Sequence, residues 1–87
     1  MEKVCKISYI LNLGQYGVSK SDLSLLSETE QEVMWFAFNK YRKMLKIGDS
    51  VSVNLTANEK PIKISLLRFR KQTYYFAIVD DKITTSH

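Results

Sequence analysis

The chain has 87 residues, of which 45% are hydrophobic and 25% are charged, and its formal net charge is +4. This length predicts a single domain spanning residues 1–87, and the apolar fraction is too high for a disordered chain. The only cysteine is Cys5 and the only histidine is His87, so an internal disulfide and a zinc site with four Cys or His ligands are both excluded. We therefore expect neither a metal nor a cofactor.

The sequence also predicts where the protein resides. No stretch approaches the roughly 20 apolar residues that a membrane span needs. The first residues, from Met1 to Val4, lack the basic and then apolar layout of a signal peptide. One free thiol fits a reducing compartment. Together these features predict a cytoplasmic protein without a membrane partner.

Residues 3–11 show the period of two that is typical of a half-buried strand. Lys6 and Ser8 lie on its polar face, and its apolar face carries Cys5, Ile7, Tyr9 and Leu11. The pattern predicts that this strand packs against the core with one side.

Residues 12–26 have no clear period. Gly14 and Gly17 end the preceding strand. The stretch from 19 to 26 fits either a short helix capped by Ser19 or Ser21, or an irregular packed loop.

A helix is predicted over residues 28–46. Ser27 and Glu30 have the spacing of a capping box, in which each side chain accepts from the backbone N–H of the other residue. Acidic residues occupy the first turn and basic residues the last, which suits the helix dipole, and we expect Gly48 to cap the C-terminal end. At about 100° per residue, the core-facing stripe consists of Met34, Ala37, Phe38, Tyr41, Met44 and Leu45.

The period returns to two after Gly48. Val51, Val53 and Leu55 alternate with polar residues, which predicts a strand with one solvated face. Residues 57–60 are expected to form a turn.

A further strand is predicted to begin at Pro61, where a missing N–H is tolerated. Its apolar parity changes at Leu66 and Leu67, which predicts a bulge there. Residues 70–73 fit a turn, and residues 74–79 are apolar on both faces, as expected of a central strand. Residues 83–87 fit either a short edge strand or a frayed tail.

These elements predict the α+β class, with one long helix packed on a small, mainly antiparallel sheet of about four strands. The order along the chain is strand, loop, helix, strand, strand, strand. Four strands offer enough surface to bury the apolar stripe of one helix.

Two aromatic residues of the helix, Trp35 and Phe36, fall outside the core-facing stripe and have basic neighbours. One interpretation is that residues 12–26 fold over them. The other is that one of them stays exposed as an aromatic anchor within a charged rim, a composition typical of protein–protein hot spots and also suited to a dimer. The candidate residues for docking a protein are Trp35, Phe36, Lys40, Lys43, Arg68, Phe69 and Arg70.

An alternative function follows from the basic and aromatic residues around the predicted turn at 70–73. Cations neutralise phosphates and aromatic rings stack on bases, so this composition fits a nucleic-acid-binding hairpin. The candidate residues for this alternative are Arg68, Arg70, Lys71, Tyr74 and Tyr75. The same composition also fits a solvated basic hairpin over a buried aromatic strand.

Catalytic machinery is not evident in the sequence. No histidine lies within the chain to act as a base, and Cys5 falls on the apolar face of a strand, where a core thiol is expected. Our first hypothesis is therefore a non-enzymatic docking protein, an inhibitor or adaptor that covers a surface of a macromolecular partner as a monomer or homodimer. Phages and mobile elements encode many small proteins of this build, which suggests such an origin.

Overall fold

Alternating apolar residues and one capped helix determine the architecture. The computed structural model describes residues 2–57 and 59–80. Its elements, in chain order, are β1 (Glu2–Ile10), β2 (Gln15–Val18), α1 (Lys20–Leu23), α2 (Glu28–Tyr41), the 3-10 helix η1 (Arg42–Met44), β3 (Ser50–Ala57), β4 (Lys60–Arg70) and β5 (Thr73–Asp80). The predicted α+β class with one main helix is confirmed.

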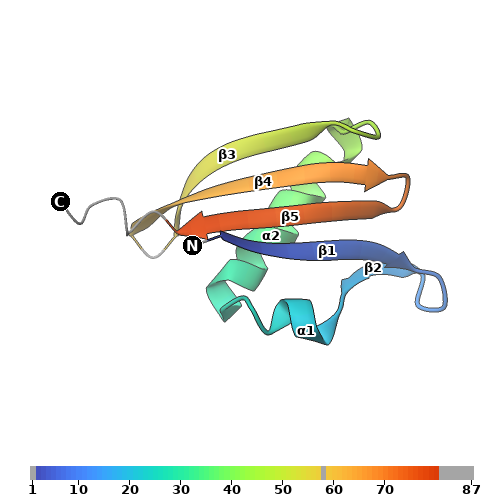
Figure 1. The fold of residues 1–87 in the computed structure, drawn as a ribbon, viewed down its shortest axis with the longest axis horizontal. Helices are drawn as coiled ribbons and strands as arrows, with labels where there is room; N and C mark the ends of the chain where they lie inside the picture. Colours follow the sequence, from blue (N-terminus) through green and yellow to red (C-terminus); the bar gives the residue numbers. More distant parts are fainter. Residues whose placement is uncertain (1, 58, 81–87) are drawn as a thin grey trace.

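The strands form one sheet in the order β2-β1-β5-β4-β3, and every neighbouring pair is antiparallel. Within residues 2–57 and 59–80 the sheet has five strands rather than about four, because residues 15–18 form β2 along β1. The strand predicted over 74–79 is central, as expected, since β5 lies between β1 and β4. Helix α2 crosses one face of this sheet at an angle (Figure 1).

The core lies between α2 and the sheet face that it covers. Strand residues alternate in burial, so that every second side chain of β1, β4 and β5 enters this core. The helix contributes Met34, Ala37 and Phe38, and the strands contribute Cys5, Ile7, Ile62, Ile64, Leu66, Tyr74, Phe76 and Ile78.

The N-terminal end of α2 forms as predicted, whereas its C-terminal end does not. Both hydrogen bonds of the capping box between Ser27 and Glu30 are present. The α-helix ends at Tyr41 rather than at residue 46, and the chain tightens into η1. Gly48, with φ 92°, therefore lies in a turn after η1 and caps no helix.

The change from α-helix to η1 also alters which side chains are buried. Leu45 adopts an extended backbone and enters the core, as predicted for its side chain. Met44, which was predicted to face the core, is 64% exposed. Asp49 closes the following turn, because its carboxylate accepts from the Lys46 N–H at 3.1 Å.

Two details of the strands differ from the prediction. Leu11 is exposed because β1 ends at Ile10 and the chain turns there. The bulge lies between Arg68 and Arg70 rather than at residues 66 and 67. No bulge is needed earlier, because β4 is apolar on both faces at that point and keeps its register with β5.

The ambiguous segment 19–26 begins as a helix. Ser19 caps α1, and its hydroxyl accepts from the Asp22 N–H at 3.2 Å. The prediction for residues 83–87 lies outside the described residues.

Candidate functional site

One face of the sheet is not covered by α1 or α2. We call it the open face, and it consists of the strand side chains that point away from α2. The three inner strands contribute Val4, Lys6 and Ser8 from β1, Tyr75, Ala77 and Val79 from β5, and Lys63, Ser65, Leu67 and Phe69 from β4. All of these side chains are half-buried or exposed, so the face is accessible to a partner.

An aromatic pair marks the open face. The rings of Phe69 and Tyr75 meet edge to face, with centroids 5.5 Å apart. Phe69 occupies the bulge of β4, where it has no residue opposite it in β5, and it is 46% exposed. The Arg70 guanidinium lies 5.1 Å from the centroid of the Phe69 ring. The bulge thus places a ring and a cation side by side on the surface.

Lys6 extends this cluster across the sheet. The register places Lys6 opposite Tyr75 on β5, and Tyr75 in turn opposite Leu67 on β4. The Lys6 backbone N–H donates to the Asp22 carboxylate at 3.0 Å, which ties β1 to α1. We name Phe69, Arg70, Tyr75 and Lys6 the aromatic–basic cluster.

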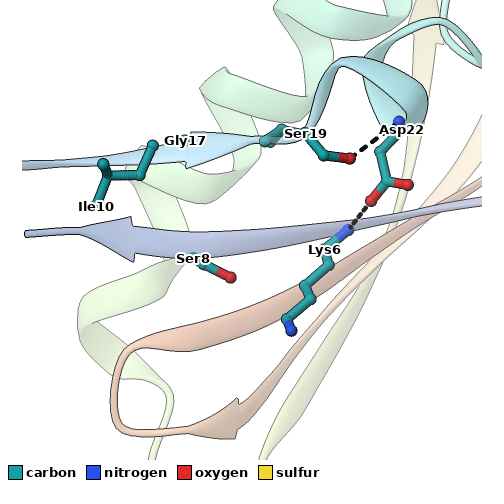
Figure 2. Close-up of a pocket in the computed structure, with 7 residues that line it drawn as sticks. Lys6, Ser8, Ile10, Gly17, Ser19 and Asp22 are labelled. Carbon is teal, nitrogen blue, oxygen red and sulfur yellow. Dashed lines mark hydrogen bonds between the residues drawn. The ribbon is translucent and has the colours of Figure 1, made fainter.

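A shallow hollow of about 320 Å³ adjoins the cluster at the β1–β2 end of the open face. Its lining includes Lys6 and Ser8, and Figure 2 shows both side chains leaving β1 on the same side. Gly17 also lines the hollow. The Ile10 side chain lies against Gly17, so that a Cβ at this position would collide with it. The hollow therefore enlarges the surface next to Lys6.

Arg68 and Tyr74 lie on the other side of the sheet. The Arg68 guanidinium donates to the carbonyl oxygens of Leu45 and Lys71, both at 2.8 Å, and lies over the Tyr74 ring. Tyr74 is only 3% exposed, and burial raises the pKa of its phenol. Of the five residues proposed for nucleic acid, the structure therefore brings Arg70 and Tyr75 to the open face, with Lys71 exposed in the adjoining turn.

The candidate residues for protein docking on α2 and η1 also differ in their exposure and position. Phe36 is 57% exposed, and the Lys40 ammonium lies 5.6 Å from its ring centroid. Lys43, in η1, is exposed too. Trp35 is half-buried and packs edge to face on Phe38. The seven candidates for protein docking thus lie on different sides of the molecule.

The segment 12–26 packs on the core and does not fold over Phe36, as one of the two interpretations had predicted. Tyr16 and Leu23 pack against the core, and Leu26 is buried in it. Phe36 nevertheless remains uncovered. It lines a second hollow, of about 330 Å³, between α2 and β3, together with Thr29, Glu32, Val33, Leu55 and Thr56. We call this region the α2 flank.

The sequence analysis named three members of the aromatic–basic cluster, namely Phe69 for protein docking, Tyr75 for nucleic acid and Arg70 for both, and missed Lys6. The available signal was the polar parity of residues 3–11, which places Lys6 away from the core. What the pattern does not contain is that the first strand pairs with the last, which brings Lys6 opposite Tyr75.

Two kinds of site are absent from the part of the chain that the structure describes. No three His, Cys, Asp or Glu side chains gather there into a group that could hold a metal ion. No helix there combines the length and apolar character needed to cross a membrane. Cys5 is buried, and desolvation, together with the charges of Asp22 and Glu30, raises the pKa of its thiol.

Known proteins offer no guide to what these surfaces bind. No family model matches the chain, and neither the curated proteins nor the solved structures include a significant match to it.

Proposed function

We propose that this protein is a non-enzymatic, cytoplasmic docking protein whose open face binds single-stranded nucleic acid. The observation that carries the proposal is the aromatic–basic cluster, in which Phe69 and Tyr75 are flanked by Arg70 and Lys6 on the open face. The geometry thereby favours the nucleic-acid alternative over a purely protein-directed function. The inhibitor or adaptor role stays a prediction.

The chemistry of the cluster suits unpaired bases. Exposed aromatic rings stack on any base, because every base has a π face. A duplex keeps its bases stacked inside, whereas single strands can splay them onto a sheet. Phe69 projects from the bulge with 46% of its surface exposed, so its ring is available for stacking.

The distribution of charge supports the same ligand. Lys6, Lys63 and Arg70 belong to the open face, and Lys71 lies in the turn beside it. Two acidic residues lie near these cations: Glu2 shares their parity at the start of β1, and the Asp22 carboxylate lies in the hollow beside Lys6. A surface with this excess of cations attracts phosphates and releases their counterions.

The direct test is fluorescence anisotropy with labelled DNA and RNA oligonucleotides of about twelve nucleotides, in single-stranded and duplex form. Binding is expected for single strands. With three or four phosphate contacts, affinity should fall roughly 20- to 50-fold between about 50 and 200 mM salt. The absence of binding by every oligonucleotide at low salt would overturn the proposal.

Variants of Phe69 test the stacking step. Loss of one base–aromatic stack costs about 1–3 kcal/mol, so Phe69→Ala should weaken binding roughly 5- to 150-fold. Phe69→Leu keeps apolar bulk without a π face and should weaken binding as well. Leu25→Ala removes a side chain of similar exposure (50%) outside the open face and should bind like the wild type.

Competition with polyglutamate separates nucleic acid from an acidic protein partner. If polyglutamate displaces the oligonucleotide at equal charge concentration, the surface recognises negative charge alone and the assignment to nucleic acid is wrong. If only oligonucleotides compete with one another, the rings contribute as proposed.

A further inference from the structure

The two edges of the sheet are protected very differently. At one edge, β2 has only four residues and pairs with residues 7–10 of β1. The next residue of β1, Lys6, donates its backbone N–H to the Asp22 carboxylate. Short edge strands and covering elements are the usual means by which proteins block pairing with another chain. This edge is therefore closed to a partner strand.

The other edge is β3, which runs for eight residues with the sequence SVSVNLTA. It contains no charged residue and no proline, and no strand among the described residues pairs with its outer side. A long, uncharged edge rich in β-branched residues is a template for strand addition. Nothing in its composition prevents such pairing.

The direction of the backbone groups on β3 follows from its pairing with β4. Hydrogen-bonded and non-hydrogen-bonded residue pairs alternate in an antiparallel ladder. The Arg68 backbone N–H donates to the backbone carbonyl oxygen of Asp49 at 2.9 Å. Pro61, which has no N–H, lies opposite Thr56. The odd residues of β3 therefore bond to β4, and the N–H and C=O groups of Ser52 and Asn54 point to the free edge.

The α2 flank continues this edge as an apolar strip. Leu55 and Val33 are half-buried and Phe36 is exposed, and the three line the hollow between helix and strand. A partner that only added a strand would leave this hollow open. A partner with its own helix beside the strand would fill it.

The charges of the flank indicate which partner fits. Glu32, Phe36 and Lys40 follow one another at intervals of four residues, within an arc of about 80° on α2. A copy aligned in the same direction would oppose Glu32 to Glu32 and Lys40 to Lys40. An antiparallel copy instead opposes Glu32 to Lys40 twice and leaves the two Phe36 rings at the centre.

We propose that a second copy of this chain adds to the outer edge of β3 in antiparallel orientation, forming a twofold dimer with a continuous sheet. The same patch on both copies then forms the interface, as closed dimers require. A register centred on Val53 pairs Val51 with Leu55 of the second copy, which keeps valine and leucine on the helix side.

The twofold axis of this dimer stands perpendicular to the sheet. Both α2 helices therefore lie on one side, and both open faces lie on the other. The dimer presents two copies of the aromatic–basic cluster in the same direction, although its formation does not depend on what that cluster binds.

Sedimentation velocity over roughly a hundredfold range of protein concentration, without nucleic acid, tests the dimer. The wild type is expected to shift from monomer to dimer as its concentration rises. Asn54→Pro removes an N–H that points to the free edge and no bond to β4, so it should raise the dimer Kd at least about tenfold. Asn54→Ala keeps that N–H and should dimerise like the wild type.

A charge exchange provides a second test that leaves β3 unchanged, in case Asn54→Pro alters the circular dichroism spectrum. Glu32→Lys should weaken the dimer, and adding Lys40→Glu should restore it. A wild type that stays monomeric throughout, or a folded Asn54→Pro variant that dimerises as well as the wild type, would overturn the proposal. So would a charge exchange without rescue.

Discussion

Tyr74 and Tyr75 are neighbours on β5, yet they occupy opposite environments. Tyr74 faces α2, is 3% exposed and meets the rings of Tyr16 and Phe38 edge to face. Tyr75 faces away from α2 and pairs with Phe69 on the open face. A shift of one residue in register would exchange these environments.

Each face also places an arginine over an aromatic ring, but the two arginines act differently. The Arg68 guanidinium lies over Tyr74 and donates to two backbone carbonyls, so it joins η1 and the β4–β5 turn to the core. The Arg70 guanidinium lies over the exposed ring of Phe69. An arginine–aromatic pair therefore identifies neither a core nor a binding site. Strand parity and the bulge decide which it is.

Thiol labelling should give the largest difference between the faces. Cys5 is completely buried, whereas the adjacent Val4 is 46% exposed. Burial also raises the pKa of the Cys5 thiol, so little reactive thiolate is present. In the native protein, Cys5 should react with Ellman's reagent at least about a thousandfold more slowly than a thiol placed by Val4→Cys in a Cys5→Ala background.

Denaturant provides the control for this labelling experiment. Both thiols should react at similar rates once the protein is unfolded. Fast labelling of Cys5 under native conditions would mean that α1 and α2 do not seal this face of the sheet.

The same substitution on the two faces should affect stability very differently. Phe76 has no exposed surface, and Phe76→Ala should lower the free energy of unfolding by about 3–5 kcal/mol. Phe69 is 46% exposed in a bulge, so Phe69→Ala should lower it by less than about 1 kcal/mol. Urea unfolding measures both values. Equal losses would mean that the open face is part of the core.

Local patterns predicted the elements whose stabilising contacts are close in sequence. The capping box at Ser27 and Glu30 needs only a spacing of three residues. The exposed parity of Ser52 and Asn54 needs only the alternation of β3. These features could be predicted because residues close in sequence determine them.

Features that depend on distant partners were not predictable. Strand β2 is too short to show a period, and Tyr16 is held by contacts to Phe38 and Tyr74 far along the chain. The sequence alone indicates a surface cation at Arg68. Its guanidinium instead donates to the Leu45 carbonyl oxygen, and this acceptor is in place only because the chain turns inward at Leu45. The candidate site was therefore predicted where β4 and β5 adjoin in sequence and was missed at Lys6.

Acid titration isolates a contact between the covered face and α2. The Glu30 carboxylate accepts from the Lys3 ammonium at 2.9 Å and from the Ser27 N–H at 2.8 Å. Partial burial alone would raise the pKa of Glu30, but these hydrogen bonds outweigh it and lower the pKa below its ordinary value of 4.5. Because the folded state holds the proton less tightly than the unfolded state, this contribution to stability is complete above pH 4.5 and is lost as the pH falls through the lowered value.

Glu30→Gln measures how much that contact contributes. The amide oxygen can still accept from the Ser27 N–H, so the cap persists while the charge is lost. The pair is partly exposed, and solvent screening limits the expected loss at neutral pH to about 1 kcal/mol or less. Urea unfolding of the wild type and the variant should therefore converge as the pH falls below 4.5. A constant difference across that range would show that the charge of Glu30 does not link α2 to β1.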